Sequence, residues 1–252
     1  MPYRRLLVAL ACVASLAGAQ VTEPQLSLSA GADVGVAGHY VRRGERLGSA
    51  GLTGRLYAER GFEGGLLFRG QVAAFTQFDG LDFSESIYDA ALGLHQQRWL
   101  GRSTLLMGYT YYARNTNPAN PAFVGSNTQE LYAGLETAGP GRPWAYVRWD
   151  FDGGAGRHND RVGVYFMAGA SHRIPVNRDI AVDLAGRLGF DFGRGVGGFN
   201  DALLQSRLNL RLSHRLSLVP ALDWWFPSGQ VWGGVHGFQL VPSLGLSYAA
   251  TF

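Results

Sequence analysis

Asp150, Asp152 and His158 are the residues of this sequence whose types and spacing best suit hydrolytic chemistry. A hydrolase needs a nucleophile or an activated water, a base within hydrogen-bond reach and a group that orients the base. These three side chains could meet at one rim of a fold and supply the acid and the base. The other histidines are scattered along the chain: His39, His95, His172, His214 and His236. The simpler explanation is that Asp150, Asp152 and His158 are polar residues in solvated loops. We therefore predict no catalytic residues, and a hydrolase is the least favoured of the functions that we consider.

The serines give no stronger indication of catalysis. Ser171 and His172 are adjacent, so on a strand their side chains point to opposite faces and cannot pair directly. Gly125-Ser126-Asn127 resembles part of a phospholipase-barrel signature, but no histidine stands at the accompanying spacing.

Metal, cofactor and nucleic-acid sites are not expected either. The only cysteine is Cys12, no two histidines have the spacing of paired ligands, and residues 150–160 lack a calcium-loop pattern. The glycine-rich run 193–198 has neither a lysine nor a following helix, which argues against a phosphate loop. A formal net charge of +3 is small for a protein that binds nucleic acid by neutralising phosphates.

Most of the charged residues belong to a regular pattern of alternating side chains. In residues 201–213, four of the six even positions are leucines (204, 208, 210 and 212), and they alternate with charged and amide side chains. This predicts a β-strand with one apolar and one charged face. The same parity along the chain gives the following candidates for the charged face: Arg55, Arg69, Asp89, Arg114, Glu130, Arg148, Asp150, Asp183, Arg187, Asp191, Arg207, Arg211 and Asp223.

The last fifteen residues, 238–252, show this alternation most clearly. Every even position is apolar or aromatic except for one proline, the odd positions are small or polar, and the chain stops on Phe252. An edge strand of a soluble sandwich would have the same pattern. The alternation alone therefore does not decide whether the apolar face meets a protein core or a membrane.

The lengths of the connections favour a membrane barrel. We predict twelve strands, at residues 26–41, 49–59, 62–76, 86–99, 103–114, 128–137, 143–152, 161–174, 179–192, 201–213, 215–226 and 238–252. Connections after even-numbered strands are brief, whereas those after odd-numbered strands are mostly longer. Such parity, with an even strand count, is typical of outer-membrane barrels, whose periplasmic turns are short. Soluble sandwiches have no reason to sort their connections in this way.

Residues 1–19 have the features of a secretory signal peptide, which leaves 20–252 as the barrel. Arg4 and Arg5 precede an apolar run, and Ala17-Gly18-Ala19 matches a cleavage site. A lipoprotein anchored through Cys12 is the alternative, but Ala9 is a poor start to a lipobox.

With these features in place, the chain resembles a bacterial outer-membrane β-barrel of the small porin-like kind. Residues Tyr40-Val41-Arg42-Arg43-Gly44 are similar to the Tyr-x-x-Arg-Gly exit of the first strand in a broad set of such barrels. The resemblance implies an all-β, antiparallel up-and-down transmembrane barrel. It also implies that Phe252 forms part of an assembly signal read by the barrel-assembly machinery.

The expected function is a narrow passive channel for small solutes, with the outer-membrane bilayer as its other partner. We expect Arg187, Arg207 and Asp223 to lie near one level of the lumen, and Asp183 to lie near Arg211. Two further pairs are expected, Arg114 with Glu130 and Asp152 with Arg161. Small inward residues should leave room for a passage: Gly31, Gly35, Gly93, Gly108, Gly163, Gly169, Gly189 and Gly245. The loops at 115–127 and 227–237 could constrict the outer mouth. A structural or surface-interaction barrel without conductance is the alternative, because a ladder of neutralising ion pairs could also fill a narrow lumen.

Overall fold

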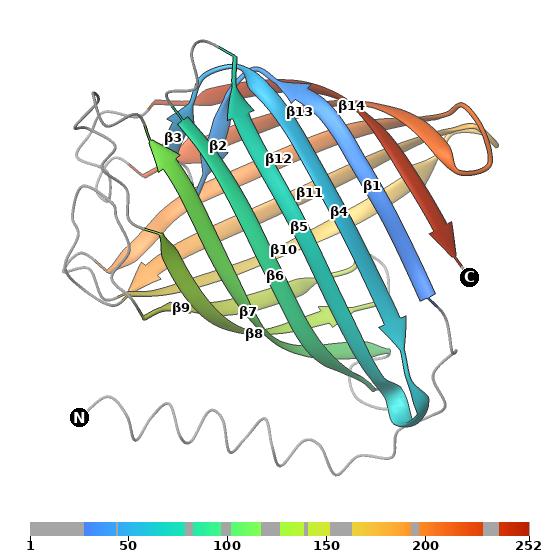
Figure 1. Ribbon diagram of the computed structural model, residues 1–252, viewed down its shortest axis with the longest axis horizontal. Helices are drawn as coiled ribbons and strands as arrows, with labels where there is room; N and C mark the ends of the chain where they lie inside the picture. Colours follow the sequence, from blue (N-terminus) through green and yellow to red (C-terminus); the bar gives the residue numbers. More distant parts are fainter. Residues whose placement is uncertain are drawn as a thin grey trace.

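Twelve antiparallel strands form one closed barrel in the computed structural model (Figure 1). The structure describes residues 28–43, 45–78, 83–96, 102–116, 127–138, 141–151, 163–192, 197–228 and 237–251. None of the segments that it describes forms a helix long and apolar enough to cross a membrane. The barrel strands are β1 (Leu28–Ala37), β4 (Gly51–Gly61), β5 (Leu66–Gln77), β6 (Phe83–Gln96), β7 (Ser103–Thr116), β8 (Thr128–Thr137), β9 (Trp144–Asp150), β10 (Gly163–Pro175), β11 (Ile180–Phe192), β12 (Gly198–Arg211), β13 (Leu216–Pro227) and β14 (Gln239–Thr251).

The barrel closes through the pairing of its first and last strands. Ser29 pairs with Thr251, and the register continues to Ala37 opposite Ser243. The start of β1 and the end of β14 lie at the same end of the barrel as the turn between β4 and β5 (Figure 1). We call this the short-turn end and the opposite one the long-loop end. The predicted strand number and antiparallel up-and-down order are confirmed.

The alternation of side chains has the predicted direction. Large apolar side chains point away from the barrel and are exposed, among them Leu56 at 62% and Leu92 at 67%. Leu246 on the closing strand is also exposed, whereas Asp201 on β12 is fully enclosed. A water-soluble sheet protein would have the opposite arrangement. The exposed apolar face therefore has the character of a lipid-facing surface.

The outward position of Leu56 gives a first prediction. Leu56→Arg should lower the free energy of unfolding in phospholipid vesicles by about 2–4 kcal/mol, because the guanidinium would lie near the bilayer midplane. Denaturant titration of vesicle-inserted protein would measure the change. The matched control, Thr53→Arg, adds the same charge on the inner side of the same strand and should cost far less. Equal losses for the two variants would contradict the assignment of the faces.

One side of the barrel interior is filled by a packed core. Leu67, Leu106 and Tyr132 form a buried cluster with Tyr146 against it, on strands β5 to β9. Tyrosine rings lie directly over glycines of neighbouring strands. A Cβ at Gly108, for example, would be 2.4 Å from the ring of Tyr132.

The expectation that the inward glycines leave room for a passage is therefore mostly wrong. Gly31, Gly93, Gly108, Gly169 and Gly189 are each covered by a larger side chain of a neighbouring strand. Gly35 and Gly245 line the cavity, although a Cβ at Gly35 would lie 2.5 Å from the backbone oxygen of Leu244.

The first predicted strand differs from the structure in an important way. Its last residues leave the barrel wall and form a separate hairpin of β2 (Tyr40–Arg42) and β3 (Glu45–Gly48). The hairpin contacts inward side chains on β5, β6, β8 and β12, which lie on different sides of the barrel. It therefore lies inside the lumen at the long-loop end, where Figure 1 shows β2 and β3 behind the front strands.

Candidate functional site

The internal hairpin is anchored first by apolar packing. The ring of Tyr40 stacks on Phe75 of β5, with 4.6 Å between the ring centroids. Leu47 packs against the same phenylalanine, and both Leu47 and Phe75 are buried. These contacts hold both strands of the hairpin against the inner face of β5.

Two arginines attach the tip of the hairpin to buried carboxylates of the barrel wall. Arg42 donates to Glu85 of β6 at 2.9 Å, and the Tyr40 hydroxyl donates to the other oxygen of the same carboxylate. The guanidinium of Arg42 also lies over the ring of Tyr112, 4.5 Å from its centroid. Because the Glu85 side chain is fully enclosed, its pairing with Arg42 offsets the cost of burying both charges.

Arg43 makes a second and more central attachment. It pairs with Glu130 of β8, which also accepts a hydrogen bond from Arg148 of β9 at 3.2 Å. The guanidinium of Arg43 lies 4.3 Å from the ring centroid of Tyr165, and its backbone carbonyl accepts from Asn200 at 2.9 Å. The backbone φ of Arg43 is 51°, in the left-handed region that turns favour.

Electrostatics keep the two arginines of the hairpin charged. Burial alone would lower the pKa of each guanidinium, but the carboxylates of Glu85 and Glu130 raise the pKa values of Arg42 and Arg43 above the ordinary value. Burial, with the negative charge of Glu85, raises the pKa of Tyr40, so this phenol stays protonated and can donate.

Further ion pairs lie elsewhere in the interior. Arg69 of β5 reaches Glu136 of β8 with two donors at 2.9 and 3.0 Å, and also donates to Glu59 at 2.8 Å. On the opposite side, Arg187 pairs with the fully enclosed Asp201 at 2.7 Å. β5 and β8 are not neighbours in the sheet, so the Arg69–Glu136 pair bridges the interior.

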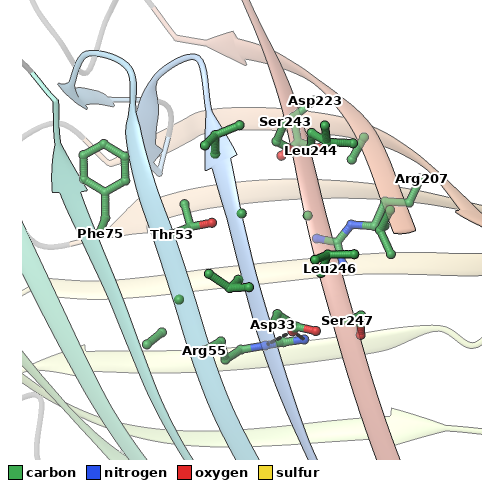
Figure 2. Close-up of a pocket in the computed structure, with 18 of the residues that line it drawn as sticks. Asp33, Thr53, Arg55, Phe75, Arg207, Asp223, Ser243, Leu244, Leu246 and Ser247 are labelled. Carbon is green, nitrogen blue, oxygen red and sulfur yellow. Dashed lines mark hydrogen bonds and ion pairs between the residues drawn. The ribbon is translucent and has the colours of Figure 1, made fainter. Parts of the chain in front are cut away.

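A cavity of about 400 Å³ lies beside the hairpin, along β1, β4 and β11 to β14 (Figure 2). Tyr40 and Phe75 contribute to its lining. The polar residues that line it are Asp33, Thr53, Arg55, Asp183, Gln205, Arg207, Asn209, Asp223, Ser243 and Ser247. Small inward residues such as Gly35, Ala73 and Gly245 leave this side of the barrel open.

The structure separates the candidate residues into groups. Arg55, Asp183, Arg207 and Asp223 line the cavity. The following lie in the packed part of the interior: Arg69, Asp89, Glu130, Arg148, Asp150, Arg187 and Asp191. Arg211 is exposed at the short-turn end of β12. The side chain of Arg114 lies outside the described residues, as do Asp152, His158, Arg161 and Phe252.

The predicted pairings within the lumen are only partly right. Arg207 and Asp223 both line the cavity, and Asp223 lies opposite Gln205, the inward neighbour of Arg207 on β12. Asp183, however, is opposite Arg207 in the sheet and accepts from Asn209, so its predicted proximity to Arg211 is wrong. Glu130 is opposite Thr110 in the sheet and pairs with Arg43 and Arg148.

Several interior residues were not among the candidates chosen from the alternation and charge of the sequence. Asp33, Glu59, Glu85 and Glu136 have the correct parity but were not selected. Arg42 and Arg43 were recognised as a motif but assigned to an outer connection. The interior carboxylates also accept hydrogen bonds from four tyrosines: Tyr112, Tyr132, Tyr146 and Tyr165. Several of these rings lie over a glycine of the neighbouring strand, and this pattern of tyrosines facing glycines could have revealed them.

Comparison with known proteins identifies the architecture. No protein-family model matches the sequence, and neither does any curated protein. An outer-membrane channel from Pseudomonas putida F1 is 12% identical, with 93% of this chain and 98% of the channel covered at a TM-score of 0.52. The NanC porin is 9% identical, with 87% and 98% covered at a TM-score of 0.50. The chain has the fold of outer-membrane β-barrels and resembles small porins and channels in that fold. At these identities the likeness concerns the fold alone.

The orientation of the outer-membrane barrel follows from its connections. Short turns lie on the periplasmic side of such barrels. By this rule the short-turn end would be periplasmic, and the internal hairpin would occupy the outer half of the lumen. Two of the short turns have side-chain caps: Asn177 accepts from Asp179 and Ile180, and Ser213 accepts from Leu216. The cavity extends from the hairpin toward the periplasmic ends of β11 and β12, where Asp183 and Asn209 lie.

Proposed function

We propose that this outer-membrane barrel is a narrow passive channel for small solutes, constricted in its outer half by the β2–β3 hairpin. The observation that carries the proposal is the polar cavity of about 400 Å³ beside the hairpin. A lumen filled only by side chains, as in the smallest barrels, would leave no such space. Arg55, Asp183, Arg207 and Asp223 would then set which solutes enter, since they line the cavity.

The remaining candidate residues would have a supporting role. Glu130, Arg148 and Arg187 would hold the hairpin and the wall around it, together with Glu85 and Asp201. Arg69 and Asp89 would keep the β5–β9 side of the lumen filled, because both bond to side chains of other strands there. The passage would therefore run along the β11–β14 side of the barrel.

The proposal includes export and assembly. Residues 1–19 would direct the chain across the inner membrane, and Phe252 with β14 would be recognised by the barrel-assembly machinery. Enzymatic activity is not part of the proposal. Ser171 and His172, the adjacent pair with hydrolytic residue types, lie on opposite faces of β10, with His172 exposed.

A closed barrel with a structural role is the second candidate, and the hairpin itself favours it. Its buried attachments through Arg42 and Arg43 fill much of the outer lumen. In this case the protein would insert into membranes without conducting.

Planar-bilayer recordings distinguish the two candidates. Purified, heat-modifiable protein should give discrete current steps that are small compared with those of wide porins, because the hairpin narrows the path. Folding is verified in the same preparation by the shift in gel mobility on boiling. Folded protein that inserts without any current steps would reject the channel and support the structural barrel.

A further inference from the structure

Arg207 stands out among the charged residues that line the cavity. Arg55, the other guanidinium there, donates to Asp33 at 2.8 Å. Arg207 has no carboxylate within ion-pair distance among the residues that the structure describes. Figure 2 shows its side chain among the residues that line the cavity. Its donors are therefore available to water or to a solute.

The neighbouring carboxylates accept hydrogen bonds from amides, and Asp183 also lies 3.7 Å from the exposed guanidinium of Arg173. Gln205 donates to Asp223 at 2.7 Å, and Asn209 donates to Asp183 at 2.6 Å. Gln205, Arg207 and Asn209 are successive inward residues of β12, so each acid beside Arg207 receives a neutral donor. An amide leaves the negative charge of its acceptor in place, and Asp223 lies opposite Gln205, the inward neighbour of Arg207 on β12. The wall thus presents separate positive and negative charges to the cavity.

The charges of the whole cavity exclude a simple anion site. Its lining includes the carboxylates of Asp33, Asp183 and Asp223, against the guanidiniums of Arg55 and Arg207. A solute with negative charge alone would be attracted by Arg207 but repelled by the acids around it. A solute with positive charge alone would be attracted by the acids but repelled by Arg207. A small molecule that carries both charges fits both parts of the wall.

We propose that the cavity binds small zwitterions of the amino-acid class, with the carboxylate on Arg207 and the ammonium group toward Asp223. The volume of about 400 Å³ lies within the range of about 300–1,000 Å³ that is common for small-molecule sites. The planar guanidinium suits a carboxylate because it can donate two parallel hydrogen bonds. The inference rests on the proposed channel, whose preferred solutes it names, but binding itself can be measured without conduction.

Binding of L-alanine to the folded protein in detergent micelles, followed by saturation-transfer NMR, tests the proposal. The wild-type chain should bind L-alanine, and Arg207→Gln should raise the half-saturating concentration by at least about tenfold, because two charge-assisted hydrogen bonds are lost. Asp223→Asn should weaken binding as well. The matched control is Arg211→Gln, which removes the same charge from the same strand at an exposed position outside the cavity and should leave binding unchanged.

Competition on the wild-type chain keeps the test independent of whether the variants fold. Acetate and ethylammonium each carry one of the two charges, and glucose carries neither, so each should displace L-alanine far less effectively than glycine does. Equal competition by acetate or glucose, or unchanged binding by folded Arg207→Gln, would overturn the zwitterion site. Binding without current steps would reject the channel alone, whereas current steps without L-alanine binding would reject the site alone.

Discussion

Replacing residues 39–48 with a short glycine–serine linker should raise the single-channel conductance by on the order of tenfold, since the outer lumen would lose its obstruction. The hairpin in this segment occupies the interior through contacts with β5, β6, β8 and β12. None of these contacts belongs to the hydrogen-bonded ladder that closes the barrel. The barrel should therefore persist without the hairpin, with a wider path for ions.

A milder change should act in the same direction. Arg42→Gln combined with Arg43→Gln removes the charges that pair with Glu85 and Glu130, which should loosen the hairpin and produce intermittent openings of higher conductance. Arg46→Gln is the matched control, because Arg46 is an exposed residue of the same hairpin. If the linker variant folds and its conductance equals that of the wild type, the hairpin does not limit the path.

Glu130→Leu should be among the most destabilising single substitutions in the barrel. Its carboxylate is 2% exposed and is shared by Arg43 and Arg148, with a further hydrogen bond from Tyr112 at 3.2 Å. Removing it leaves two enclosed guanidiniums without their counter-charge, which typically costs about 3–5 kcal/mol. Denaturant titration in vesicles would measure the loss of unfolding free energy.

Two further variants show whether the loss comes from the buried charges. Asp33→Asn breaks the Arg55 pair, whose side chains are 44% and 29% exposed, and should cost no more than about 1 kcal/mol because water screens that pair. Adding Arg148→Met to Glu130→Leu should recover part of the stability, since one unpaired charge is removed. A Glu130→Leu variant as stable as Asp33→Asn would mean that the buried network contributes little.

Much of the barrel could be predicted from the sequence because a strand with unlike faces imposes a period of two. β14 and β8 were placed to within a residue at each end, and the parity of the connections indicated which end carries the short turns. Each of these features is local or depends on chain length alone, so a single sequence carries it.

The internal hairpin could not be predicted in the same way. Tyr40 and Val41 continue the alternation of β1, and nothing in that pattern indicates that the chain leaves the wall at Gly38 and turns into the lumen. The decisive contacts of Arg42 and Arg43 involve Glu85 and Glu130, which are distant in sequence. The resemblance to a Tyr-x-x-Arg-Gly motif identified the correct residues without their position.

The predicted proximity of Asp183 to Arg211 failed for a related reason. Pairing between adjacent strands depends on register, and a shift of two residues keeps every side chain on its face while changing all of its partners. Asp183 therefore has the predicted parity but bonds to Asn209 instead of lying near Arg211. Pairs such as Arg69 with Glu136 join strands that are not neighbours, so only the closed barrel brings them together.

Cysteine accessibility along β14 tests the central assignment of the two faces most directly. The predicted mature chain, 20–252, has no cysteine, so Ser243, Leu244, Leu246 and Ser247 can be replaced one at a time. In vesicle-inserted protein, a small water-soluble thiol reagent should modify the cysteines at 243 and 247, whose side chains alternate with the exposed, outward-facing Leu244 and Leu246 and therefore point inward. It should leave those at 244 and 246 unmodified, and a fluorophore placed there should be quenched by lipid-attached quenchers. Reaction at 244 and 246 with protection at 243 and 247 would contradict a lipid-facing apolar surface around an aqueous interior.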